Sequence, residues 1–163
     1  NIIIFFMGYI TMYLKNKAKK IWLSITSNIN HDKLESLLLK TKEIFNTMQA
    51  SDRLYLFKDK IEIFISMIKD YISGNYKNVP WKVISAIAAS LLYLLLPFDA
   101  IADFFPLIGL LDDAFIIGLC IKSFNDEIEK YREWKYGIYD YTYIDDKEKY
   151  KKESEETSKE NEE

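Results

Sequence analysis

An apolar stretch from Pro80 to Ile121, interrupted by four aspartates, constrains the fold of this chain more than any other feature of its sequence. An ionised carboxylate is costly to bury without a partner, so each of these aspartates needs a structural or functional explanation. The 163 residues contain only 5 Gly and 3 Pro, which leaves little material for a β fold rich in turns. We therefore expect an all-α protein, a small bundle of about five helices.

Two predicted helices within this stretch form a central apolar hairpin. The first spans residues 81–96, and Pro80 suits the turn at which it begins. The second spans residues 112–135 and becomes charged from Asp126 onward. Between them two prolines and a glycine, which favour or resist particular backbone angles, would shape an elbow: Pro97, Pro106 and Gly109.

Three further helices are predicted before the hairpin. Apolar residues recur at helical spacing over residues 10–25, 31–49 and 51–73. Local capping residues support these boundaries: Asn30 or Asp32 would cap the second helix, Ser51 the third, and Gly74 suits a left-handed C-terminal position.

The chain length fits one domain with tails, and 49% hydrophobic residues are enough to form a core. We divide it into an N-terminal amphipathic or apolar segment at 1–29, a helical domain at 30–137 and a tail at 138–163. The core of the domain is the stretch 80–121. From about residue 145 the tail is almost free of hydrophobic side chains, so we expect it to be disordered.

The N-terminal segment allows two interpretations. Its lysines lie opposite the apolar face of the predicted helix 10–25, which carries Trp22; they are Lys15, Lys17, Lys19 and Lys20. Such a basic amphipathic helix can lie on an anionic membrane surface. The alternative is an ordinary packing helix whose lysine face is solvated. The apolar run 2–14 is shorter than the roughly 20 residues that a membrane span needs. Because the chain begins at Asn1, we interpret it as truncated, processed or over-extended, with Met7 or Met12 as candidate starts.

Capping explains most of the aspartates. Asp99 would cap a short helical turn at 100–105, Asp112 would cap the second hairpin helix, and Asp113 would lie in its first turn beside the positive end of the helix dipole. Asp103 has no capping role, and it lies one turn after Asp99 on the same face.

The alternative interpretation takes the four aspartates, Asp99, Asp103, Asp112 and Asp113, as one acidic cluster. Carboxylate oxygens bind Mg²⁺ or Ca²⁺, and paired carboxylates can share a proton. No histidine or cysteine lies close enough in the sequence to favour a transition metal, and the spacing is not that of an EF-hand. We favour capping and internal hydrogen bonds, with no cofactor; a divalent-cation-binding or proton-handling protein is the alternative.

At these residues the chain resembles the YkvA-like family, a bacterial domain of unknown function. The resemblance rests on VPWKVISAIAASLLYLLLPFDAIADFFPLIGLLDDAFIIGLCIKS, with DYISGNY before it and EIEKYREW after it. The family pattern falls on Tyr93, Pro97, Asp99, Asp103, Pro106, Gly109, Asp112 and Asp113. One position departs from it, because Ala102 stands where a proline is expected before Asp103. The resemblance implies a small, often membrane-associated protein without an established activity.

Several common functions are excluded or disfavoured. The net charge of −3 provides no field for nucleic acid. Cys120 lies in an apolar run and is interpreted as a buried hydrophobic residue, and His31 as a surface residue. We find no nucleophile–base pair, phosphate-binding glycine loop or nucleotide motif, so we expect no enzymatic activity.

The hairpin fits either a membrane or a soluble bundle. Residues 83–96 are too few for a span, and extension to Phe105 would place Asp99 and Asp103 inside the membrane at high cost. A transmembrane or re-entrant hairpin and a buried hairpin of a soluble protein both remain open. The lysines favour the cytoplasmic side of a bacterial cell membrane. We therefore predict a noncatalytic, membrane-associated helical module that contacts lipid, not nucleic acid, and can form homo-oligomers; the alternative is a soluble cytoplasmic protein.

Overall fold

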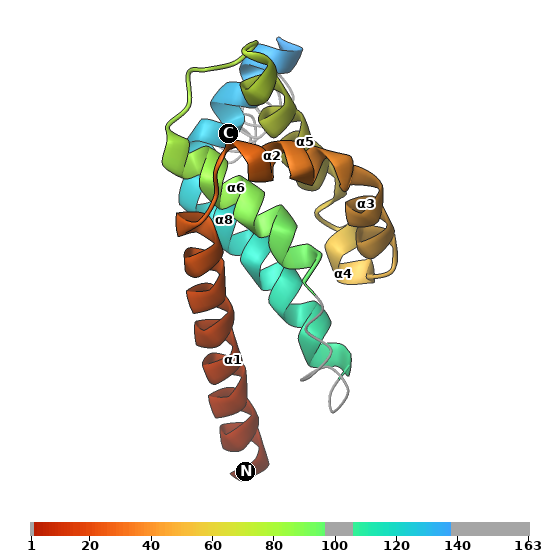
Figure 1. Ribbon diagram of the computed structural model, residues 1–163. Coiled ribbons are helices and arrows are strands. Elements are labelled where there is room, and N and C mark those ends of the chain that lie inside the picture. The colour runs from red at the N-terminus through yellow and green to blue at the C-terminus, as the bar shows by residue number, and fades with distance from the viewer. Residues whose placement is uncertain (1, 97–105, 138–163) are drawn as a thin grey trace, which may run out of the picture. The chain divides into compact units, whose positions relative to one another are not determined.

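The computed structural model describes residues 2–96 and 106–137, with the backbone alone for residues 106–112. All regular elements of the described residues are α-helices, so the predicted all-α class is confirmed (Figure 1). They are α1 (Ile2–Ser27), α2 (His31–Leu39), α3 (Thr41–Gln49), α4 (Asp52–Tyr55), α5 (Lys58–Ser73), α6 (Trp81–Leu94) and α8 (Pro106–Tyr136). The expected disorder of the tail concerns residues outside the described part.

The chain forms two compact units, Asn1–Glu129 and Lys130–Glu163. The first unit contains α1 to α6 and most of α8. The described part of the second unit is the end of α8, which stops at Tyr136, and Gly137, whose φ of 61° places it in the left-handed region.

The core of the first unit is built around α6. Every residue from Val83 to Leu91 is buried, and α1, α2, α3 and α5 all contact this helix. The sequence explains its position, because α6 carries no charge after Lys82 and so has no face suited to water. The predicted helix 81–96 is confirmed to within two residues.

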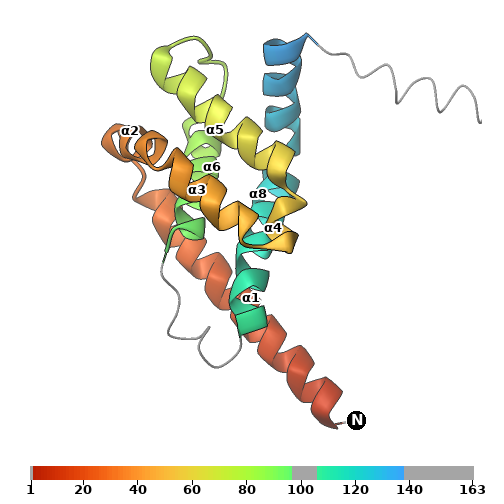
Figure 2. The ribbon, with the colours of Figure 1, turned by 90° about the vertical axis from the view of Figure 1, so that its right-hand side faces the viewer.

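The hairpin of α6 and α8 is also confirmed. The two helices lie side by side and run in opposite directions (Figure 2). The thiol of Cys120 on α8 forms a hydrogen bond with Ser90 on α6. Residues 97–105, which connect them, are not among the described residues.

The start of α8 corrects the prediction. The helix begins at Pro106, so Asp112 and Asp113 lie in its second turn, and neither the predicted cap at Asp112 nor the first-turn position of Asp113 is right. Proline is favoured at a first helical position, and the leucine-rich residues after it continue the helix. Gly109 lies inside this helix.

Two other predicted helices are each divided in two. The predicted helix 31–49 breaks at Lys40, whose φ and ψ are −95° and 10°, and the predicted helix 51–73 breaks before Lys58. No Pro or Gly marks either break, so packing rather than propensity decides them. Ser51 and Gly74 cap as predicted: Ser51 accepts from the backbone N–H of Leu54, and Gly74 has a φ of 81°. Of the two candidates for the second helix, Asn30 and Asp32, the cap is Asn30, which accepts from the backbone N–H of Lys33.

Candidate functional site

The first helix has two halves with opposite environments. In the half 2–13 no side chain is charged, and all but the half-buried Ile10 are exposed. The exposed large apolar side chains are Ile2, Ile3, Ile4, Phe5, Phe6, Met7, Tyr9, Met12 and Tyr13. The exposed fraction is 80% at Phe5 and 62% at the adjacent Phe6, so no single face of this half is covered. We call residues 2–13 the exposed half of α1; its apolar surface is of the kind that marks an interaction site.

The other half of α1 packs against α6. Leu14, Ala18 and Trp22 recur every four residues and are all buried. The indole Nε1 of Trp22 donates to Ser90 Oγ at 2.9 Å and to the carbonyl oxygen of Ala86 at 3.1 Å. The small side chains of α6 allow this close approach. The second half of α1 is thereby fixed to the core.

Ser90 joins three helices at one point. Its hydroxyl accepts from Trp22 of α1, donates to the Ala86 carbonyl at 2.8 Å within α6, and bonds with the thiol of Cys120 of α8. Burial raises the pKa of Cys120 to about 12, an effect that the hydrogen bond with Ser90 offsets only in part. The thiol is therefore protonated at neutral pH, which agrees with the buried, unreactive cysteine that we predicted.

Four lysines follow the exposed half directly. Lys15, Lys17, Lys19 and Lys20 are all exposed. The ammonium of Lys15 lies 5.6 Å from the centre of the Phe115 ring on α8, a cation–π distance. The side chains of Lys17, Lys19 and Lys20 lie on faces of α1 that are open to solvent. We call these four residues the lysine band; they lie on the solvent-exposed side of the packed half of α1, next to its exposed half.

These contacts decide between the two interpretations of the N-terminal helix over residues 14–27. The apolar face with Trp22 contacts α6 and is not free for lipid, so the packing alternative is correct there. The apolar surface lies in residues 2–13, which helical spacing did not single out. The sequence did carry a signal for this surface, because residues 2–13 form an apolar run without a charged residue and without a polar face.

The structure does not bring the four aspartates together within its described part. Asp99, Asp103 and Pro97 lie outside that part, and only the backbone of Asp112 is described. Asp113 is half-buried. Among the described residues no group of three or more His, Cys, Asp or Glu side chains could hold a metal ion. The acidic cluster therefore stays a prediction. Of the family positions, Tyr93 is buried in α6 and Pro106 begins α8.

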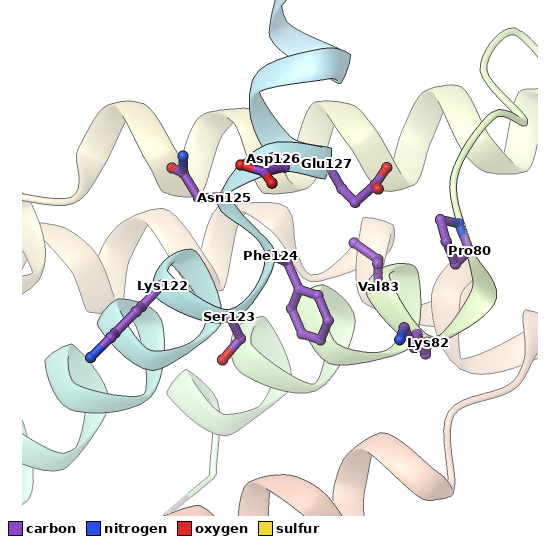
Figure 3. A pocket seen from close by; sticks show the side chains of 9 residues that line it. All are labelled: Pro80, Lys82, Val83, Lys122, Ser123, Phe124, Asn125, Asp126 and Glu127. Atoms are coloured by element: carbon purple, nitrogen blue, oxygen red, sulfur yellow. The ribbon is translucent and has the colours of Figure 1, made fainter.

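A shallow cavity of about 350 Å³ lies where α8 kinks at Phe124, whose φ and ψ are −130° and 26° (Figure 3). The start of α6 forms its other wall, with Pro80, Lys82 and Val83. The charges that line the cavity are of both signs: Lys82, Lys122, Asp126 and Glu127. This mixture singles out no class of ligand.

His31 is exposed, as predicted, but it is part of an aromatic group. Its ring lies 5.3 Å from that of Trp81 and 6.3 Å from that of Tyr71, and Tyr71 and Trp81 are 6.1 Å apart. The three rings come from the starts of α2 and α6 and the end of α5. The contacts among these rings stabilise this end of the core.

Within the described residues, no helix combines the length and the apolar character that crossing a bilayer requires.

Comparison with known proteins gives two matches. Residues 83–119 match the model of a family described as a protein of unknown function (DUF1232), and these residues include the elbow pattern. The chain is also 31% identical over 75 residues to the uncharacterized membrane protein YkvA of Bacillus subtilis (strain 168), which covers 46% of this chain and 71% of that protein. No solved structure matches. The exposed half of α1 and the lysine band lie outside the residues that the family model matches.

Proposed function

Because this chain belongs to the YkvA-like family of proteins of unknown function (DUF1232), which includes a membrane protein, we propose that it is a noncatalytic helical module that attaches to a membrane. The exposed half of α1 enters the hydrocarbon layer. The lysine band lies at the lipid headgroups, and the core of the first unit stays at the membrane surface.

The observation that carries this proposal is the exposure of apolar side chains on all sides of residues 2–13. A helix that lies flat on a bilayer needs one apolar and one polar face, and the exposed half has no polar face. Burial of one large apolar side chain contributes about 1.5–3 kcal/mol, and nine such side chains are exposed here. The backbone of a helix is internally hydrogen-bonded, so it can enter lipid without leaving polar groups unsatisfied.

The lysine band supports attachment to an anionic membrane surface, on the cytoplasmic side. Each lysine near such a surface contributes about 1 kcal/mol of attraction. Lysines beside a membrane-inserted segment favour the cytoplasmic face. The ammonium of Lys15 also lies over the Phe115 ring of α8, at 5.6 Å from its centre, so one lysine of the band contacts the core.

Flotation with lipid vesicles tests the proposal. The full chain is mixed with vesicles of phosphatidylglycerol and phosphatidylcholine and centrifuged in a density gradient. The double variant Phe5→Glu/Phe6→Glu places two charges in the exposed half without touching the core. A matched variant, Leu39→Glu/Leu56→Glu, changes two remote side chains that are 88% and 83% exposed. We expect the wild type and the matched variant to float and the α1 variant to remain at the bottom. Flotation of the α1 variant at the wild-type level would contradict the proposal.

A further inference from the structure

The exposed half of α1 receives little support from packing. It projects beyond the other helices of the first unit (Figures 1 and 2), and all its side chains are exposed except the half-buried Ile10. Most helical stability in proteins comes from the packing of one face, and about 12 residues without it are marginal in water even when rich in alanine. The packed half, with Leu14, Ala18 and Trp22, supplies a helical nucleus. The stability of residues 2–13 in water therefore depends on how readily each residue extends that nucleus.

The composition of residues 2–13 disfavours this extension. Nine of the twelve residues are Ile, Phe, Tyr or Thr, which lose side-chain freedom in a helix or compete with its backbone, and one is Gly8. Even good helix formers raise the helix population by a factor of only about 1–1.6 per residue. Apolar pairs one turn apart, such as Phe5 and Tyr9, offset part of the loss. The helix in this half is therefore marginal in water.

Two local features weaken the same half further. A Cβ at Gly8 would meet nothing within 4 Å, so no packing contact requires a glycine at this position. Glycine in a helix loses more backbone freedom than any other residue. The hydroxyl of Thr11 donates to the carbonyl oxygen of Met7 at 2.8 Å, and this type of bond slightly destabilises a helix.

The lysine band disfavours the helix next to the exposed half. Lys15 and Lys19 are four residues apart, and Lys17 and Lys20 are three apart, so like charges lie on the same faces and destabilise the helix in water. The sequence of α1 contains no acidic residue, so no ion pair within the helix compensates them. Anionic lipid headgroups supply the missing negative charge.

In hydrocarbon the balance is reversed. A backbone N–H or C=O has no water there to replace a lost hydrogen bond, so an inserted segment must be helical. From this contrast we propose that the exposed half of α1 is a conditional helix. In water it exchanges between helical and unfolded forms, and insertion into an anionic membrane completes the helix that the structure shows. This inference rests on the proposed membrane attachment and adds the folding step that accompanies insertion. Membrane affinity then depends on the fraction of the chain that is helical before it binds.

Hydrogen exchange of the full chain, followed by mass spectrometry with and without vesicles of phosphatidylglycerol and phosphatidylcholine, tests this inference. In buffer we expect the amides of residues 6–13 to exchange within about tenfold of the unstructured rate, and those of residues 18–23 roughly a thousandfold more slowly. On vesicles the amides of residues 6–13 should become slower by about a hundredfold or more. The variant Phe5→Glu/Phe6→Glu should show no such protection.

Two further variants separate helix formation from the transfer of apolar surface. Gly8→Ala should slow exchange of residues 6–13 in buffer by about two- to fivefold and leave residues 18–23 unchanged. Ile2→Leu/Ile3→Leu/Ile4→Leu keeps the number of atoms and nearly the same transfer into lipid, but leucine extends a helix more readily. This variant should bind phosphatidylglycerol vesicles about two- to fourfold more tightly. Equal affinity would contradict a helix that is incomplete before binding.

The other outcomes also decide. Slow exchange of residues 6–13 in buffer, with the chain still floating with vesicles, would overturn this inference and leave the proposed attachment intact. If that protection disappeared on dilution, a second copy and not lipid would complete the helix, which would overturn it as well. Flotation without protection of residues 6–13 would show insertion without helix formation and would have the same consequence. Absence of flotation would overturn the proposed function too.

Discussion

The indole Nε1 of Trp22 donates a hydrogen bond to Ser90 Oγ at 2.9 Å, across 68 residues of sequence. This contact fixes the second half of α1 to the core and leaves the first half without a partner among the described residues. The division of one helix into a fixed half and an exposed half is the basis of the proposed membrane attachment. It also assigns Trp22, which the sequence placed on a candidate lipid-facing surface, to the protein core.

Replacement of Trp22 tests the fixed half. Trp22→Phe removes both hydrogen bonds of the indole and keeps most of its apolar surface. We expect the free energy of unfolding to fall by about 1–3 kcal/mol, because a buried partner loses its donor and a small void remains. Urea denaturation followed by circular dichroism measures this change. Leu23→Ala, at the adjacent exposed position, is the control and should lie within about 0.5 kcal/mol of the wild type. Equal stability of Trp22→Phe and the control would show that the contact does not hold α1.

The buried thiol predicts a dependence of stability on alkaline pH. Burial raises the pKa of Cys120 from its ordinary value of 9.0 to about 12 in the folded protein. The unfolded chain therefore releases this proton at a lower pH than the folded protein, and stability present below pH 9 is lost as pH rises towards 12. Relative to Cys120→Ala, the wild type should lose about 1.4 kcal/mol per pH unit above pH 9. Chemical denaturation of both proteins between pH 8 and about pH 10.5 measures this difference. A constant difference over that range would contradict the burial of the thiol.

The lysine band predicts a dependence of vesicle binding on lipid charge. Lys17→Gln/Lys19→Gln/Lys20→Gln should weaken binding to phosphatidylglycerol vesicles by about 3 kcal/mol at low salt, and have little effect on neutral vesicles. The matched variant Lys40→Gln/Lys42→Gln/Lys69→Gln removes three exposed lysines elsewhere. Binding is measured by titration of vesicles at low and at high salt. If both triple variants weaken binding equally, net charge and not the lysine band determines attachment.

The acidic cluster predicted from the sequence can be tested in solution. We expect calorimetric titration with Mg²⁺, Ca²⁺ and Mn²⁺ to show no saturable binding tighter than millimolar, in keeping with a noncatalytic module. Saturable binding that disappears in Asp99→Asn/Asp103→Asn would support the cation hypothesis instead. An unchanged signal in that variant would place the bound ion at other carboxylates.

The sequence predicted those parts of the fold that depend on local chemistry. Ser51 and Gly74 were assigned correctly, and the cap of α2 was narrowed to Asn30 or Asp32, because a cap involves only residues within one turn of each other. The break at Lys40 was not predicted, since no local signal marks it and the packing against α6 decides it. The start of α8 was predicted too late. Asp112 is a good N-cap residue, but Pro106 is a good first helical residue, and the helix begins at Pro106.

The candidate site was predicted only in part, for a related reason. Periodicity identified the apolar face that carries Leu14, Ala18 and Trp22, but it could not show whether α6 or lipid covers that face. The partners of Trp22, Ala86 and Ser90, are more than 60 residues away in the sequence. Residues 2–13 have no periodicity, so their exposure became evident only once the packed half of α1 had been located. The lysines were recognised correctly as a group, and the structure adds their position at the boundary between the two halves.

The central claim is that the exposed half of α1 enters the hydrocarbon layer along its axis. A scan of single fluorescent labels at residues 3–13, on vesicles of phosphatidylglycerol with lipid quenchers at known depths, tests it most directly. Axial insertion predicts that depth increases steadily from residue 13 to residue 3, without helical periodicity. A depth that oscillates with a period of about 3.6 residues would show a helix lying flat on the surface, and labels that stay in water would show no insertion; either result would contradict the account.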